Sequence, residues 1–209
     1  MQHVMESVSA SPVPQARPYV CPWWLGWTLV LPVRRWLLKP ESWLEPLVRP
    51  GFRVLEVGPG TGLFTVPLAE RVGTAGKVWC VDLQPRMLKM LDRRLRRRGL
   101  AERISLRTCS AEDLGVADLT DTMDLAVLIY VLHEVPAPAR TLTQVASTLR
   151  VGGRLLLVEP RGHCPAPLFA EQLRIAHDLG LAARDDELAP KLRGLQAAVL
   201  EKVQHPLPR

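Results

Sequence analysis

The chain has 209 residues, 47% of them hydrophobic, so it is long enough to bury a core and too apolar to be disordered throughout. Its 27 Lys and Arg exceed its 21 Asp and Glu, which gives a formal net charge of +6. The four cysteines (Cys21, Cys80, Cys109 and Cys164) form no C-x-x-C pair and have no histidine partner at zinc spacing. This excludes the common structural zinc motifs and favours a reducing, cytoplasmic compartment.

The N-terminal fifty residues read as two segments. Residues 1–18 are rich in serine and proline and are predicted to be a flexible leader. Residues 19–50 contain an apolar run that is shorter than the ~20 residues of a membrane span and is interrupted by Pro22 and Pro32. No basic leader or small-residue cleavage site precedes the run, so we do not expect a signal peptide.

The second segment also carries an aromatic cluster, made of Trp23, Trp24 and Trp27. We predict helices over 33–38 and 41–48, and a segment that covers the substrate pocket. Packing against the core and contact with a membrane surface are the alternatives.

The domain proper is expected over 51–209, and it opens with a short apolar strand at 53–57. Glycines follow this strand at three alternate positions, Gly58, Gly60 and Gly62. Only glycine adopts positive φ cheaply and lets backbone N–H groups press against a ligand. With a helix predicted at 65–72, the pattern indicates a nucleotide-type site at the carboxyl end of a parallel sheet. A tight turn that needs glycine for geometry alone is the alternative.

The glycine spacing separates cofactor classes. A dinucleotide-binding turn reads G-x-G-x-x-G, but Leu63 stands where its third glycine would be. No Lys-Ser or Lys-Thr follows the glycines, which excludes a phosphate-binding loop of the Walker type.

Strands and helices then alternate along the chain, as in a doubly wound α/β domain. The second strand ends in Asp82, whose carboxylate can accept hydrogen bonds from both hydroxyls of a ribose. Strands are predicted at 77–82, 104–108, 123–130 and 155–160, the last preceded by an entry segment at 149–154. Helices are predicted at 86–98, 139–149 and 168–179, and a closing strand pair at 182–188 and 195–203. On the helix at 86–98, leucines are expected to face the sheet and the arginines and lysine to face outward.

Glu56, Gly58, Gly60 and Gly62 match, position for position, the E/D-x-G-x-G-x-G motif of the class I S-adenosylmethionine-dependent methyltransferases, and the chain resembles that family. The resemblance implies a Rossmann-like seven-stranded sheet with helices on both faces and an antiparallel last strand. It implies S-adenosylmethionine as cofactor and S-adenosylhomocysteine as product.

The resemblance also assigns the cofactor site. The residues implied are Glu56, Gly58, Pro59, Gly60, Gly62, Asp82, Leu83, Ser110, Ala111, Glu112, Ile129, Tyr130 and His133. Two positions depart from the family pattern. Ser110 stands where an adenine-contacting Asp is usual, and Val151 replaces the proline of the L-x-P-G-G-x-L segment before the fifth strand.

Methyl transfer needs a base only where the acceptor must lose a proton early. His133 and Glu134, just beyond the fourth strand, are the candidates: the imidazole titrates near neutral pH, and the carboxylate could orient it or act itself. Packing at the cofactor's edge and a helix-start carboxylate are the alternatives. No resident metal is expected. The isolated Cys21, Cys109 and Cys164, with His163, raise arsenic-type methylation only as a minor hypothesis.

The sequence therefore predicts a methyltransferase that acts on a small-molecule acceptor, with apolar molecules among the candidates. The alternatives are a catalytically silent cofactor-binding or scaffold protein, and an RNA methyltransferase using the basic helix face. No Asn-Pro-Pro-Tyr-type motif follows the fourth strand, which argues against an adenine or glutamine nitrogen as acceptor. We expect a small-molecule partner in preference to nucleic acid, membrane contact as a minor alternative, and a monomer or homodimer.

Overall fold

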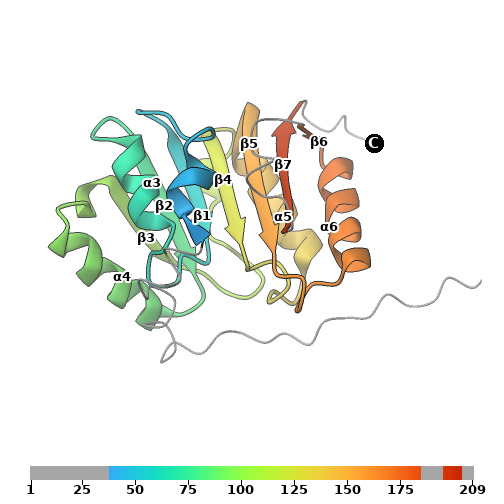
Figure 1. Cartoon of the computed structure of the whole chain (residues 1–209), viewed down its shortest axis with the longest axis horizontal. Coiled ribbons are helices and arrows are strands. Elements are labelled where there is room, and N and C mark those ends of the chain that lie inside the picture. Colours follow the sequence, from blue (N-terminus) through green and yellow to red (C-terminus); the bar gives the residue numbers. More distant parts are fainter. Residues whose placement is uncertain (1–37, 185–194, 204–209) are drawn as a thin grey trace, which may run out of the picture.

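One mixed sheet organises the part of the chain that the computed structural model describes, residues 38–184 and 195–203 (Figure 1). Its strand order is β3-β2-β1-β4-β5-β7-β6. The strands are β1 (Arg53–Val57), β2 (Lys77–Asp82), β3 (Ile104–Thr108), β4 (Met123–Ile129), β5 (Leu149–Glu159), β6 (Leu181–Ala183) and β7 (Gln196–Lys202). β7 runs antiparallel to both β5 and β6. The predicted Rossmann-like sheet with an antiparallel last strand is thus confirmed, while residues 185–188 of the predicted closing pair lie outside the described residues.

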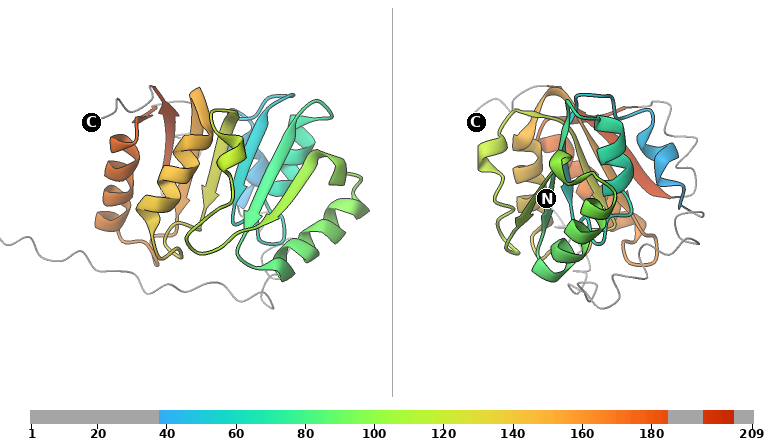
Figure 2. Two further views of the ribbon diagram at one scale, coloured as in Figure 1. Left: turned by 180° about the vertical axis from the view of Figure 1, so that it is seen from behind. Right: turned by 90° about the vertical axis from the view of Figure 1, so that its left-hand side faces the viewer.

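Helices cover both faces of the sheet. The helices described are α2 (Pro40–Leu44), α3 (Thr65–Val72), α4 (Pro85–Arg97), α5 (Pro138–Thr148) and α6 (Ala166–Asp178), with short 3-10 turns η2 (Ala101–Arg103) and η3 (Ala117–Leu119). α2, α3 and α4 pack on one face, and α5 and α6 on the other (Figure 2). α4, α5 and α6 begin one or two residues earlier than predicted. Each has proline in its first turn, where the missing N–H costs nothing and the fixed φ suits a helix.

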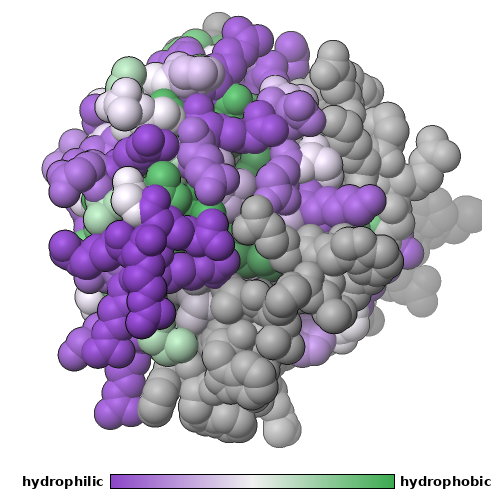
Figure 3. All heavy atoms as spheres, turned by 60° about the vertical axis from the view of Figure 1, so that its left-hand side comes forward, coloured by the Kyte–Doolittle hydropathy of each residue, from purple (hydrophilic) through white to green (hydrophobic). Residues whose placement is uncertain are grey.

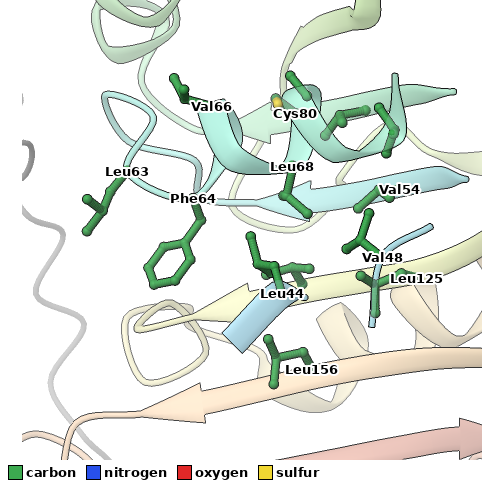
Figure 4. Packing of buried hydrophobic residues seen from close by; sticks show 14 of the residues in the cluster. Leu44, Val48, Val54, Leu63, Phe64, Val66, Leu68, Cys80, Leu125 and Leu156 are labelled. Atoms are coloured by element: carbon green, nitrogen blue, oxygen red, sulfur yellow. The ribbon is translucent and has the colours of Figure 1, made fainter. Parts of the chain in front are cut away.

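The start of the described chain belongs to the core. Trp43, Leu44, Leu47 and Val48 are at most 4% exposed. Figure 4 shows Leu44 and Val48 between α3 and the apolar side chains of the strands. The helix predicted over 41–48 is shorter, because α2 ends at Leu44 and the chain continues as a turn in which the Val48 N–H donates to the Leu44 carbonyl. The helix predicted over 33–38 lies almost wholly outside the described residues.

The parallel strands β1 to β5 all end at one edge of the sheet (Figure 1). The loops after these ends carry most of the residues to which sequence patterns assign function. No helix within residues 38–184 and 195–203 is long and apolar enough to cross a bilayer.

Candidate functional site

The predicted cofactor residues gather at the carboxyl edge of the sheet. Glu56 and the glycine turn lie at the end of β1, and Asp82 and Leu83 at the end of β2. Ser110, Ala111 and Glu112 follow β3, while Ile129, Tyr130 and His133 close β4 and its loop. The Gly58 N–H donates to the Val81 carbonyl at 2.9 Å and the Cys109 N–H to the Asp82 carbonyl at 3.1 Å, so the loops are tied strand to strand.

The glycine turn requires glycine for both backbone angle and space. The backbone angle φ is 67° at Gly58, 54° at Gly60 and 91° at Gly62, values that residues other than glycine rarely adopt. A Cβ on Gly58 would lie 2.5 Å from Cγ2 of Val131, and one on Gly62 would lie 2.5 Å from Cδ1 of Leu91. The turn is therefore packed between the loop after β4 and helix α4.

Glu56 lies beneath the turn rather than on its surface. It is 4% exposed, and its Oε2 accepts hydrogen bonds from the Thr65 hydroxyl at 2.6 Å and the Cys80 thiol at 3.5 Å. Burial raises the pKa of Glu56 to about 7, and the charge of Asp82 adds to this, while the two hydrogen bonds oppose it. Glu56 is thus an internal acid that joins the end of β1 to the first residue of α3 and to β2.

Asp82 and Leu83 follow one another at the carboxyl end of β2, beside the glycine turn. The Asp82 side chain lies at the edge of the turn, with Oδ1 accepting the Gln84 N–H at 2.8 Å. Burial raises its pKa, and backbone N–H groups of Gln84 and Gly60 counteract that effect. A carboxylate has about four lone-pair positions, which leaves acceptor capacity for a vicinal diol. The next side chain, Leu83, is a large hydrophobic group that is 42% exposed, as a surface for a flat base requires.

A side chain of helix α5 hydrogen-bonds to the backbone of the loop after β3. The Ser110 hydroxyl accepts the N–H groups of Asp113 at 2.9 Å and Glu112 at 3.3 Å, so it shapes its own turn. The Gln144 side chain accepts the Leu114 N–H at 2.8 Å and donates to the Glu112 carbonyl at 3.0 Å. No local sequence pattern marks Gln144, because it lies 30 residues from its partner Leu114.

The loop after β4 begins with backbone strain. Tyr130 has a φ of 60°, which is energetically costly for a bulky aromatic residue. Residues with such backbone angles are common at functional sites. Its N–H donates to the Val158 carbonyl of β5 at 2.8 Å, which holds the loop against the neighbouring strand.

His133 is paired with Glu159, a residue to which the sequence analysis assigned no role. The Glu159 side chain is fully buried, its Oε1 accepts the Leu132 N–H at 2.8 Å, and its Oε2 contacts Nδ1 of His133. Oε1 of Glu134, the other carboxylate predicted to orient the imidazole, lies 3.9 Å from Nε2, within ion-pair but beyond hydrogen-bond distance, and its role stays a prediction. The signal was present in the sequence: Glu159, like Glu56 and Asp82, is an acid at or near the end of a buried parallel strand.

Cys80, Cys109 and Cys164 are the cysteines within the described residues, and all three are free thiols. Burial raises the pKa of Cys109 and of Cys164 to about 11, so both are thiols near neutral pH. Among the residues described, no three His, Cys, Asp or Glu side chains are grouped to hold a metal ion. Cys21, the third member of the metalloid hypothesis, lies outside those residues.

The basic face of α4 is exposed as predicted, with one exception. Leu88, Leu91 and Leu95 are buried, and the surface on this side of the molecule is strongly hydrophilic (Figure 3). Arg94, by contrast, is half-buried, and its Nη1 donates to the Thr61 carbonyl of the glycine turn at 2.9 Å. The expectation that all the basic residues of this helix face outward is therefore wrong for Arg94, which lies one helical turn after Leu91 on the side facing the glycines.

Comparison with known proteins agrees with this geometry. Residues 55–157 match a family model described as a methyltransferase domain. The ubiquinone/menaquinone biosynthesis C-methyltransferase UbiE of Cronobacter sakazakii is 32% identical over 163 residues, which are 76% of this chain and 62% of that protein. The UbiE of Idiomarina loihiensis is 33% identical over 112 residues, 54% of this chain and 44% of that protein. The chain thus spans about half the length of the curated relatives it matches.

Solved structures share the fold. A SAM-dependent methyltransferase from Aquifex aeolicus superposes with a TM-score of 0.71 at 21% identity, over 87% of this chain and 97% of that one. A SAM-dependent O-methyltransferase from Thermotoga maritima gives a TM-score of 0.60 at 22% identity, over 81% and 67%. With the motif, the strand order and the matching domain in agreement, the chain belongs to the class I S-adenosylmethionine-dependent methyltransferases, a family of enzymes whose cofactor is S-adenosylmethionine.

Proposed function

We propose that this chain transfers a methyl group from S-adenosylmethionine to a small-molecule acceptor. The observation that carries the proposal is the glycine turn at the end of β1 beside the Asp82 carboxylate at the end of β2. The turn would receive the methionine part of the cofactor, Asp82 the ribose, and Leu83 with the loop after β3 the adenine. When bound, the cofactor supplies an electrophilic methyl group on a good leaving group.

The chain's own part is to align the acceptor, exclude water and take up a proton where one is released. His133 lies on the loop that packs against the glycine turn through Val131, and it is the candidate base. Glu134 remains a second candidate, since it follows His133 on the same loop.

The acceptor class rests on the named relatives. The two UbiE proteins are named as C-methyltransferases of quinone biosynthesis, which supports a small, apolar acceptor here. The exposed basic face of α4 supports RNA as a second candidate. Incubating the chain with methyl-labelled cofactor and separate small-molecule, lipid and RNA fractions decides between them. Label in RNA alone would overturn the first candidate, and tight cofactor binding without any turnover would favour a silent scaffold.

Replacing Asp82 tests the cofactor site directly. Asp82→Ala should weaken S-adenosylmethionine binding by about 1.5–3 kcal/mol, roughly a ten- to 150-fold rise in Kd, because a charged hydrogen-bond acceptor is lost. Titration calorimetry measures this, with Asp178→Ala as the control, since Asp178 lies on α6 at the opposite face and pairs with Arg174. Unchanged affinity in Asp82→Ala, or tighter binding of NADH than of S-adenosylmethionine, would contradict the assignment.

A further inference from the structure

The buried carboxylate of Glu159 contacts two consecutive residues of the loop after β4. One oxygen accepts the Leu132 N–H at 2.8 Å, and the other contacts Nδ1 of His133. Glu159 is fully buried at the end of β5, and the His133 side chain is 7% exposed. A backbone group and the neighbouring ring are therefore fixed by the same side chain.

We propose that Glu159 is a positioning residue that keeps His133 in the tautomer protonated at Nδ1, so that Nε2 is the atom that takes a proton from the acceptor. The proposal rests on the proposed function. As a carboxylate, Glu159 can only accept hydrogen bonds, and Oε1 already receives one from Leu132. Oε2 therefore requires the proton on Nδ1, and a neutral ring then carries its lone pair at Nε2.

Nε2 is placed for this role. Its nearest carboxylate oxygen, on Glu134, is 3.9 Å away, beyond hydrogen-bond distance. The ring also meets that of His163 edge to face, at 5.6 Å between centroids. Val131, two residues earlier, packs on Gly58 of the cofactor turn. The loop thus connects the proton-accepting ring to the place where the methyl donor would bind.

This arrangement suits an acceptor whose attacking atom carries a proton, an O–H or an activated C–H. The acceptor's O–H or C–H bond breaks, its proton moves to Nε2 and from there to water, and the electron pair left behind forms the bond to the methyl group. The methyl–sulfur bond of the bound cofactor would break with its electron pair remaining on sulfur, so that S-adenosylhomocysteine is the leaving group. Glu159 touches neither partner and acts only through His133.

The Glu159→Gln variant separates positioning from simple packing. Because the Leu132 N–H still needs an acceptor, the Gln carbonyl oxygen should take the place of Oε1, which turns the amide NH₂ toward Nδ1. Nδ1 must then accept, and the proton moves to Nε2, where it blocks the base. The same substitution at Glu134, whose oxygen is 3.9 Å from Nε2, should leave the tautomer as it was.

The experiment is ¹⁵N imidazole spectroscopy on the full chain, under conditions in which the spectrum shows a neutral ring, with the signals of His133 assigned by their loss in His133→Asn. The native protein and Glu134→Gln should both show a protonated Nδ1 and an unprotonated Nε2. Glu159→Gln should show an unprotonated Nδ1 and a protonated Nε2. Calorimetry should give Kd values for S-adenosylmethionine within about twofold of one another for the native chain and Glu159→Gln.

Protonated Nε2 in the native chain, or an unchanged tautomer in folded Glu159→Gln, would overturn the proposal. The native spectrum alone can do so even if the variant does not fold. Loss of cofactor binding in Glu159→Gln, with or without a tautomer change, would make the residue structural and also overturn it. Absence of S-adenosylmethionine binding by the native chain would instead remove the proposed function on which the inference rests.

Discussion

At the residue scale, the glycine turn combines an unusual backbone angle with a close contact, and the two can be separated. Gly58 has φ of 67° and would place a Cβ 2.5 Å from Val131, whereas Gly99 has φ of 66° and open space around it. Gly99→Ala should therefore lower the free energy of unfolding only by the cost of a left-handed backbone at alanine, about 1–2 kcal/mol. Its affinity for S-adenosylmethionine should be unchanged.

Gly58→Ala should add a steric effect on the site itself. Val131 is stiff at χ1, so the loop that carries His133 must shift, and we expect Kd for S-adenosylmethionine to rise at least about tenfold. Calorimetry and thermal melts of both variants check this. Equal affinities for the two variants would mean that the contact between Gly58 and Val131 has no part in binding.

Glu56 should make the stability of the apo-protein depend on pH. Its folded pKa of about 7 lies above the ordinary value of 4.5. Between these pH values the unfolded chain has released a proton that the folded protein keeps, so the free energy of unfolding falls as pH rises. At about 1.4 kcal/mol per pH unit the penalty reaches about 3 kcal/mol above pH 7 and vanishes below pH 4.5.

Glu56→Gln, which is neutral at every pH, should remove that slope. Denaturant unfolding at pH 5, 6, 7 and 8 measures it, and the exposed Glu112→Gln is the control. A variant whose stability follows pH as the native chain does would show that Glu56 is ionised in the folded state.

At the scale of elements, α4 both covers the sheet and braces the cofactor turn. Arg94 donates to the Thr61 carbonyl at 2.9 Å, and its neighbour Arg93 is exposed on the same helix. Arg94→Met keeps an apolar stem but leaves that carbonyl without this donor. We expect S-adenosylmethionine binding to weaken by about 1 kcal/mol, roughly fivefold in Kd.

Arg93→Met removes the same charge from the same helix and is the matched control, expected to bind the cofactor normally. If both variants lose affinity equally, the effect belongs to the net charge of α4 and not to the bond with Thr61. Calorimetry at two salt concentrations distinguishes the two, since only the charge effect is screened.

At the scale of the whole molecule, a buried lysine joins the last strand to the edge of the sheet away from the site. Lys202 is 2% exposed, and its ammonium donates to Asp121 at 2.8 Å and to the carbonyls of Ala146 at 3.0 Å and Leu149 at 2.7 Å. All three protons of the ammonium group are thus engaged, and β7 is fixed to the end of α5 and the start of β5.

Lys202→Met should lower the free energy of unfolding by about 3 kcal/mol, because it leaves two buried carbonyls without that donor and breaks the ion pair with the partly exposed Asp121. For a chain of this size the melting temperature should fall by roughly 6–12 °C. Cofactor affinity should be unchanged, because the lysine lies at the opposite edge. Lys89→Met, on the exposed face of α4, is the control. An equal fall in the free energy of unfolding in both variants would show that Lys202 has no special structural role.

The order of strands and helices could be predicted from the sequence because it depends on local patterns. Apolar runs that end in an acid marked β1 and β2, and the spacing of Leu88, Leu91 and Leu95 marked the buried face of α4. The glycine turn was also readable, since positive φ at alternate positions selects glycine whatever surrounds it. The first residues of α4, α5 and α6 were predicted less accurately, because each helix begins at or just before a proline that the hydrophobic periodicity did not include.

The side-chain contacts between residues far apart in the chain could be identified only in the tertiary structure. Glu159 meets His133 across 26 residues, and Arg94 meets Thr61 across 33, because β4 and β5 end side by side and α4 packs over the turn. A polar side chain carries no local sign of which distant partner will satisfy it; that partner is set by which strands pair. The strands, the glycine turn and the resemblance that implied the sheet and the cofactor could all be predicted from the sequence, since each depends on residues close together in the chain. The partner of the candidate base and the brace of the turn came from the fold, because only the packed strands and helices place those side chains within hydrogen-bond distance.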